Sequence, residues 1–306
     1  MSAEKNGARL PPTRQESEAA AADRAAHKAA REQKDAQVRG VASIDAMRTA
    51  IKAAARLLPA IAEVPRLKAL DTAAFRARAA QGLPFLMTGA AGRWPLAALT
   101  VQTLREHYSH LPVRARVGDY VNTAFAADRA MQDMSLIEYL DLVAAGTDGL
   151  PPYLGNLELR ELNRLCHWPS YFDKMGPPRF WLGPAGTVTP LHCDYDDNVF
   201  AQLWGSKRIV LAPPHHDEFL YPAEANAILF GSPFDPEAPD FDRFPLARHA
   251  TTIECIVAPG DMLYVPAGWY HQVRSLTFSL SSNRWARAVP LALRGTPGTA
   301  TPGTVK

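Results

Sequence analysis

Two histidines and one aspartate stand where they could hold a single metal ion. His192 and Asp194 are separated by one residue in the segment TPLHCD. Residues two apart in a β-strand point to the same face, so one imidazole and one carboxylate can reach the same ion. His271 ends a second segment, PGDMLYVPAGWYH, in which Pro-Gly-Asp and Pro-Ala-Gly make turns around a short strand. Two histidines and a carboxylate form the facial triad of non-haem Fe(II) oxygenases, which leaves coordination positions open for a co-substrate and O₂.

The simpler alternative is that these are ordinary polar residues. An H-x-D tripeptide alone is a weak signal, and only its combination with the second segment favours a metal site. Four other histidines have no partner at a spacing typical of metal ligands: His107, His110, His167 and His249. The His215-His216 pair follows two prolines in a predicted loop and is expected to be solvated.

The elements that must position the triad read as short strands. After Leu150, apolar runs alternate with Pro, Gly and Asp turns, a pattern typical of a double-sheet jelly roll or cupin barrel. The expected strands are 180–182, 198–203, 208–211, 252–258, 262–265, 271–273 and 277–283. We therefore predict a mainly β fold with flanking helices, a double-stranded β-helix core over residues 151–293 and a helical N-terminal region.

The region before the barrel is expected to mix helices with short strands. Residues 71–81, 100–108 and 134–144 have helical patterns, and 83–87 and 113–117 read as strands; we expect residues 41–150 to pack on the core. Residues 17–58 are rich in Ala, the best helix former. The part up to residue 40 is weakly apolar, so two interpretations stay open: a disordered or solvated helix, or a helix that forms a homodimer. The Gly/Pro/Thr-rich tail, 294–306, is expected to be disordered.

Composition points to a cytoplasmic protein. The chain has 33 basic and 31 acidic residues, a net charge of +2, and gives no reason to expect nucleic acid or an anionic membrane as a partner. Its 3 cysteines include no C-x-x-C pair, which suits a reduced compartment. The N-terminus has no apolar segment of a secretory signal, and no apolar run approaches the length of a membrane span.

The sequence resembles the cupin-like JmjC oxygenases, a family that includes protein asparaginyl hydroxylases. The resemblance is carried by GTVTPLHCDYDDNVFAQLWGSKRIVLAPP and by PGDMLYVPAGWYHQV with FSLSSNRW. It implies a double-stranded β-helix, Fe(II) held by His192, Asp194 and His271, and 2-oxoglutarate and O₂ as co-substrates. The chain lacks the C-terminal helices through which asparaginyl hydroxylases of the family dimerise, so we do not expect that mode of dimerisation.

The same resemblance assigns residues to the 2-oxoglutarate pocket. It implies that Lys207 pairs with the distal carboxylate and that Thr189 donates a hydrogen bond to it. Asn198, Asn283 and Tyr153 match further residues that line this pocket. A dianion buried in a barrel needs a cation and hydroxyl donors, because an unpaired buried charge is costly. Taken alone, however, Lys207 could also be a solvated lysine, and Asn198 could cap a turn.

These observations predict an oxidoreductase, a dioxygenase that hydroxylates a C–H bond of a protein, peptide or small-molecule substrate and releases succinate and CO₂. The metal carboxylate is an aspartate, whereas many histone lysine demethylases use glutamate, which favours hydroxylation over demethylation. Two alternatives remain: a cupin-type enzyme that does not use 2-oxoglutarate, and a cupin-like binding protein without enzymatic activity.

Overall fold

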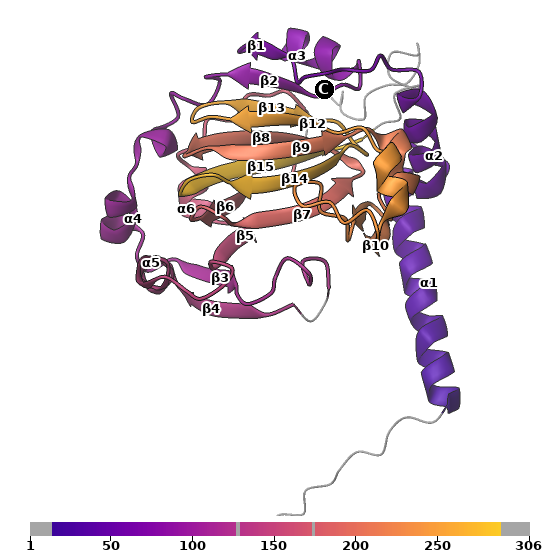
Figure 1. Cartoon of the computed structure of the whole chain (residues 1–306), viewed down its shortest axis with the longest axis horizontal. Coiled ribbons are helices and arrows are strands. Elements are labelled where there is room, and N and C mark those ends of the chain that lie inside the picture. Colours follow the sequence, from indigo (N-terminus) through magenta and orange to yellow (C-terminus); the bar gives the residue numbers. More distant parts are fainter. Residues whose placement is uncertain (1–13, 127–128, 173–174, 289–306) are drawn as a thin grey trace, which may run out of the picture.

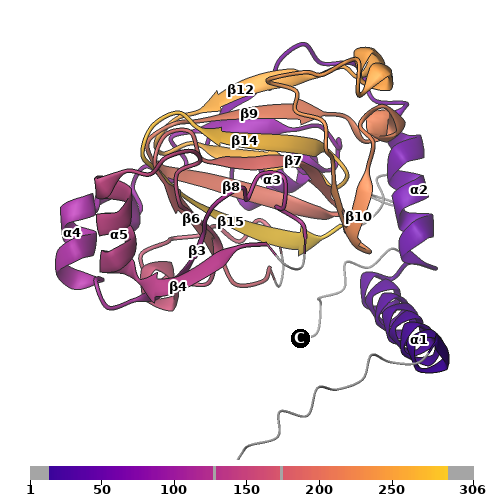
Figure 2. The same ribbon diagram turned by 60° about the horizontal axis from the view of Figure 1, so that its bottom comes forward.

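Two facing β-sheets form the body of the protein (Figures 1 and 2). The computed structural model describes residues 14–126, 129–172 and 175–288. The larger sheet has 9 strands in the order β1 (Arg66–Lys68), β2 (Phe85–Thr88), β13 (Met262–Val265), β8 (Asp196–Trp204), β15 (Ser279–Arg287), β6 (Arg179–Gly183), β5 (Tyr153–Leu157), β3 (Pro112–Arg116) and β4 (Met131–Ser135). The smaller sheet has 6 strands in the order β10 (Ala223–Asn226), β11 (Leu229–Gly231), β7 (Val188–Asp194), β14 (Tyr270–Ser275), β9 (Lys207–Ala212) and β12 (Ile253–Val257). This mainly β, jelly-roll architecture confirms the predicted fold class.

Alternating side chains explain how the sheets pack. One apolar cluster fills the space between them and includes Phe200, Ile209 and Leu263. A second cluster lies under the flanking helices, and a third lies beneath the N-terminal helices. β8 and β9 are joined by a tight turn at Gly205, whose φ of +62° and close approach to the Phe278 carbonyl leave no room for a side chain. This turn fixes where Lys207 enters the barrel.

The helices begin at side-chain caps that their sequences supply. Asp71, Thr100 and Ser135 accept hydrogen bonds from the first turns of α3 (Thr72–Ala79), α4 (Val101–His107) and α5 (Leu136–Ala145). Ser135 and Glu138 complete a capping box. The short elements are α6 (Arg160–Asn163), η1 (Pro95–Ala98), η2 (Pro214–Phe219) and η3 (Pro245–His249). α4 and α5 lie at one end of the barrel, opposite the N-terminal helices (Figures 1 and 2).

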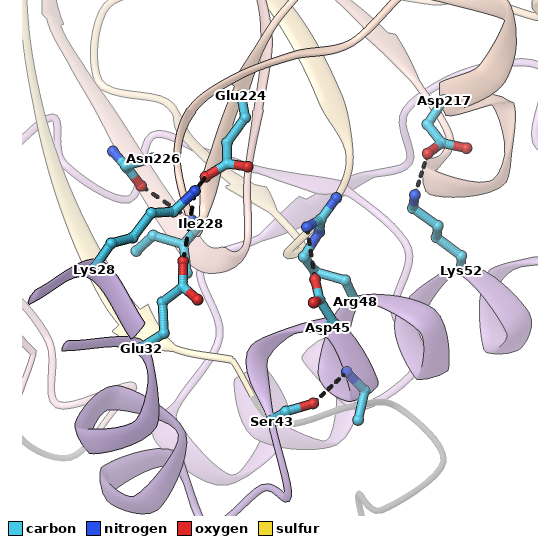
Figure 3. Close-up of polar contacts among 11 residues, drawn as sticks. Lys28, Glu32, Ser43, Asp45, Arg48, Lys52, Asp217, Glu224, Asn226 and Ile228 are labelled. Atoms are coloured by element: carbon cyan, nitrogen blue, oxygen red, sulfur yellow. Dashed lines mark hydrogen bonds and ion pairs between the residues drawn. The ribbon is translucent and has the colours of Figure 1, made fainter. Parts of the chain in front are cut away.

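The Ala-rich N-terminus forms two helices, α1 (Arg14–Arg39) and α2 (Ile44–Ala55), separated by Gly40 with a φ of +68°. α2 buries Ile44, Met47 and Ile51 against the barrel. α1 is mostly exposed and runs away from the body beside β10 (Figure 1). Ion pairs attach the two helices to the barrel, as Figure 3 shows for Lys28 with Glu224 and Lys52 with Asp217.

The last turn of α1 is held more firmly than the rest of the helix. Arg39 is 5% exposed, and its guanidinium bonds to Asp35 and to Asp196 at 2.6 Å each.

The nine-stranded sheet takes strands from both sides of residue 150. The division of the chain at residues 40 and 150 stays a prediction, and the tail from residue 294 lies outside the described residues.

Two further facts concern the cysteines and the helices. The 3 cysteines, Cys166, Cys193 and Cys255, are free thiols. In the described part of the chain, no helix is both long and apolar enough to cross a membrane.

Candidate metal centre

Three side chains from two adjacent strands converge inside the barrel. β7 carries His192 and Asp194, and β14 carries His271 directly opposite His192. One ligand atom from each of the three lies within 4.8 Å of the others, and among the described residues this is the one such group of His, Cys, Asp and Glu. The two imidazole centroids are 4.1 Å apart. The three predicted ligands therefore share one site, with a donor set suited to Fe(II).

Backbone carbonyls set the tautomers of both histidines. His192 Nδ1 is 2.8 Å from the Pro190 oxygen, and His271 Nδ1 is 3.0 Å from the Trp269 oxygen. Each Nδ1 therefore carries the proton and donates it, which leaves each Nε2 lone pair available to a metal. Burial lowers the pKa of His192 well below its ordinary value and the pKa of His271 to about 4. Both imidazoles are thus neutral, the form that binds metal.

Trp285 orients the carboxylate of the site. Its indole Nε1 donates to Asp194 Oδ2 at 3.1 Å, which leaves the other oxygen for coordination. Burial raises the pKa of Asp194 to about 7, and the indole hydrogen bond opposes that rise. Sequence analysis did not single out Trp285, because β15 pairs with β8 rather than with β7, and only this tertiary arrangement brings the indole to Asp194.

A β-bulge brings Thr189 to the same face as His192. His271 pairs with His192 and Val273 pairs with Thr189, so β14 advances by two residues while β7 advances by three. The extra residue lies in the Pro190-Leu191 stretch, and proline is tolerated at such bulges because it has no amide hydrogen to donate. In a regular strand, Thr189 and His192 would face opposite sides.

Lys207 is a buried cation within reach of the same cavity. It is 0% exposed, and its Nζ donates to the Ser281 hydroxyl at 2.8 Å. The ammonium lies 5.5 Å from the Phe200 ring centroid and 5.9 Å from that of Tyr153. No ion pair joins it to a carboxylate among the described residues, and burial lowers its pKa to about 7. The solvated interpretation of Lys207 does not hold, and its Ser281 partner was not foreseen.

The other predicted pocket residues surround this lysine. Asn283 Nδ2 donates to Asn198 Oδ1 at 3.0 Å across β15 and β8. Tyr153 is fully buried; burial raises its pKa to about 12, while the nearby Thr189 hydroxyl lowers it. Thr189 Oγ1 and Asn283 Oδ1 are both buried. Neither atom has a described partner at a good hydrogen-bonding distance and angle.

These unsatisfied groups gather around one cavity between the sheets. It is lined by Tyr153, Trp181, Thr189, His192, Asp194, Asn198, Phe200, Lys207, Ile209, Leu263, Val265, His271, Val273, Asn283 and Trp285. All eight sequence-predicted site residues are in this lining. A cation without a counter-charge, in a cavity that is also lined by the hydroxyls of Thr189 and Tyr153, fits a bound dianion, so the site suits 2-oxoglutarate as well as iron.

Two tryptophans contribute to the aromatic lining of the cavity. Trp181 and Trp285 border the cavity, with ring centroids 5.7 Å apart. Tyr195 and Tyr270 pack instead in the cluster beneath the N-terminal helices, and Trp269 packs between the sheets. Trp204 donates its indole hydrogen to the Leu96 carbonyl, outside the cavity.

The chain is similar in sequence to several known proteins. A model of the cupin-like domain family matches residues 71–290. The chain is 45% identical over 105 residues to lysine-specific demethylase JMJ30 of Arabidopsis thaliana, covering 34% of this chain and 24% of that protein. It is 32% identical over 160 residues to human bifunctional peptidase and (3S)-lysyl hydroxylase JMJD7, covering 44% and 48%. It is 32% identical over 124 residues to tRNA wybutosine-synthesizing protein 5 of Gallus gallus, covering 40% and 38%. The matched part spans about a quarter of the length of JMJ30.

Proposed function

Because this chain belongs to the cupin-like domain family, and to its JmjC type, we propose that it is an Fe(II)- and 2-oxoglutarate-dependent oxygenase that hydroxylates a C–H bond of a protein or peptide. One observation carries the proposal. The cavity that holds the cluster of His192, Asp194 and His271 also holds Lys207, a buried ammonium without a counter-charge. An iron site alone would not need that cation, whereas a dianionic co-substrate would.

Separate residues would bind the iron and the 2-oxoglutarate. His192 and His271 offer Nε2, and Asp194 offers the oxygen that Trp285 leaves free. Lys207 pairs with the distal carboxylate of 2-oxoglutarate. When bound, iron with 2-oxoglutarate and O₂ supplies the oxidation itself: one oxygen atom enters the substrate C–H bond, and the other enters succinate as CO₂ is released.

The hydroxyls and amides then complete the co-substrate pocket. Thr189 and Tyr153 both line the cavity, and both hydroxyls can donate to the distal carboxylate. Asn198 and Asn283 hold each other in place, with the Asn283 oxygen still available. Trp181 and Trp285 add aromatic surface to the lining of the cavity.

The proposal is tested by turnover of 2-oxoglutarate in the absence of a known substrate. Full-length protein is loaded with Fe(II) without oxygen, and succinate formation is followed after oxygen is admitted. We expect slow succinate formation that requires Fe(II) and is lost in Asp194→Ala. Absence of both 2-oxoglutarate binding and succinate formation would instead favour a cupin enzyme with other chemistry or a binding protein.

Demethylation is the second candidate, because several relatives are named as lysine-specific demethylases. Mass spectrometry of substrate peptides recovered from a cell extract separates the two reactions. A hydroxylase adds one oxygen atom to an unmodified peptide, whereas a demethylase removes a methyl group and releases formaldehyde. Formaldehyde released in proportion to succinate would overturn the hydroxylase proposal.

A further inference from the structure

Arg116 places a second buried cation on the cavity side of the large sheet. It is the last residue of β3 and is only 8% exposed. In the register of β3 and β5 it pairs with Tyr153, and paired residues point to the same side of a sheet. Because Tyr153 lines the cavity, the Arg116 side chain starts on that face.

Gly155 leaves the space that this guanidinium occupies. A Cβ atom on Gly155 would lie 2.8 Å from Arg116 Cζ, so a larger residue there would displace the guanidinium from its present position. Gly155 pairs in turn with Trp181, another residue of the cavity lining. The guanidinium therefore extends from β3 across β5 toward the wall formed by Trp181, at the edge of the metal cavity.

The surroundings of Arg116 lack a negative charge. Among the described residues no carboxylate forms an ion pair with it, and its Nε is buried without an acceptor. The groups that interact with it electrostatically are the phenols of Tyr120 and Tyr153 and a second cation, Arg129. Arg129 Nε is likewise buried without an acceptor, and its Nη1 donates only to the Ala124 carbonyl, at 3.3 Å. Burial lowers the pKa of Arg116, and Arg129 lowers it further.

This cationic pair differs in position from the lysine assigned to 2-oxoglutarate. Arg116 Cζ is 5.6 Å from the Tyr153 ring centroid, and Lys207 Nζ is 5.9 Å from it. Lys207 reaches the cavity from β9 in the small sheet, whereas Arg116 belongs to β3, near the edge of the large sheet.

We propose that Arg116, supported by Arg129, binds an oxyanion of the substrate, so that the target C–H bond belongs to an acidic residue or to its immediate neighbour. This inference rests on the proposed function and names its substrate class. A guanidinium binds a carboxylate or phosphate through paired, charge-assisted hydrogen bonds, and the bound anion would supply the missing counter-charge. A cationic side chain, such as a methylated lysine, would instead be repelled from this edge of the cavity.

The test uses full-length protein with Mn(II) and 2-oxoglutarate, so that binding is measured without turnover. Fluorescent peptide mixtures with randomised flanks differ at one fixed central residue: Asp, Glu, phosphoserine, Asn, Gln, Lys or Arg. We expect acidic centres to bind at least about tenfold tighter than their amide counterparts, equivalent to about 1.4 kcal/mol. The phosphoserine arm distinguishes phosphate from carboxylate as the favoured anion.

Charge reversal gives the decisive comparison. Arg116→Glu should move the preference from acidic to basic centres, and Arg116→Met should abolish the preference for acidic ones. Arg114→Glu is the matched control, since it makes the same charge change on the same strand at an exposed position paired with Asp133. If Arg116→Glu does not fold, Arg116→Met and Arg129→Met carry the test, with circular dichroism as the check on folding.

Two results would overturn the inference, and neither depends on the proposed function failing. Wild-type protein could bind 2-oxoglutarate yet show no preference for acidic centres. Alternatively, Arg116→Met could weaken the binding of 2-oxoglutarate more than the binding of acidic peptides. That result would mean that the guanidinium binds the co-substrate. Loss of 2-oxoglutarate binding in the wild-type protein would contradict the proposed function itself.

Discussion

Arg39 Nη1 lies 2.6 Å from Asp196 Oδ1, which joins the end of the N-terminal helix to the strand that begins just after Asp194. The Arg39 side chain is 2% exposed and also bonds to Asp35 at 2.6 Å and to the Tyr195 carbonyl at 3.4 Å. The helix is therefore anchored within two residues of a proposed metal ligand.

We expect Arg39→Met to lower the free energy of unfolding by about 2–3 kcal/mol. This is below the roughly 3–5 kcal/mol lost when a fully buried pair is broken, because Asp196 retains some solvent access. Denaturant unfolding of the variant measures the change. Arg31→Met, at an exposed position of the same helix, should leave stability within experimental error. Equal stability of Arg39→Met and wild type would mean that the ion pair is not formed in solution.

His192→Ala and Asp194→Ala should each abolish iron binding and succinate formation while leaving the fold intact. Each removes one of the three ligands, and neither side chain fills the apolar clusters of the core. Metal content after dialysis and circular dichroism are the measurements. His110→Ala, a surface histidine with 63% side-chain exposure, is the control. Full activity in purified His192→Ala protein would refute the assignment of the triad.

Trp285→Phe should weaken iron binding by about 10–100-fold, because residues that orient metal ligands typically contribute that much. The substitution keeps an aromatic ring but removes the N–H that bonds to Asp194. Competition with a metal chelator measures the affinity. Trp204→Phe loses a comparable indole hydrogen bond to a backbone carbonyl away from the metal site, and its iron affinity should be unchanged.

Lys207→Ala should raise the KM for 2-oxoglutarate by at least an order of magnitude, since removing one partner of a buried ion pair costs roughly 3–5 kcal/mol. Initial rates of succinate formation over a range of 2-oxoglutarate concentrations provide the measurement. A control variant, Lys68→Ala, removes a lysine from exposed β1. A KM equal to that of wild type would revive the alternative of a cupin enzyme that does not use 2-oxoglutarate.

The affinity for 2-oxoglutarate should fall as the pH rises above about 7. In the protein without 2-oxoglutarate, burial lowers the pKa of Lys207 to about 7. A bound carboxylate favours the protonated ammonium. Binding above this pH therefore requires uptake of a proton, which weakens affinity by up to about tenfold per pH unit. Calorimetry in buffers of different ionisation enthalpy detects that proton. Lys207→Arg, which stays charged, should lose this proton uptake; uptake equal to that of wild type would assign the proton to another group.

The sequence indicated which residues gather around the cavity better than it indicated their geometry. His192 and Asp194 follow the two-residue alternation of a strand, so their shared face could be foreseen. Thr189 could not be placed by that rule, since the bulge after it is a feature of strand pairing. Arg116 and Trp285 acquire their roles from strands far away in the chain, and no local pattern marks them.

The secondary structure shows the same division. Strongly patterned elements such as β13 and the helix after Ser135 were predicted close to their observed positions. β10 and β4 were missed because they are short and mostly polar, and they exist only through pairing with β11 and β3. The last turn of α1 looked solvated in sequence because the acid that pairs with Arg39 is distant along the chain.

The hydrogen bonds that fix the two imidazole tautomers have a consequence for engineering. Each histidine donates to the backbone carbonyl two residues earlier in the chain, so no distant carboxylate or amide is needed to set its tautomer. A short segment thus contains both a metal ligand and the carbonyl that determines which imidazole nitrogen faces the metal. Grafting these two segments onto another antiparallel barrel of matching register should transfer a correctly protonated pair of imidazoles, with only the carboxylate support to be rebuilt.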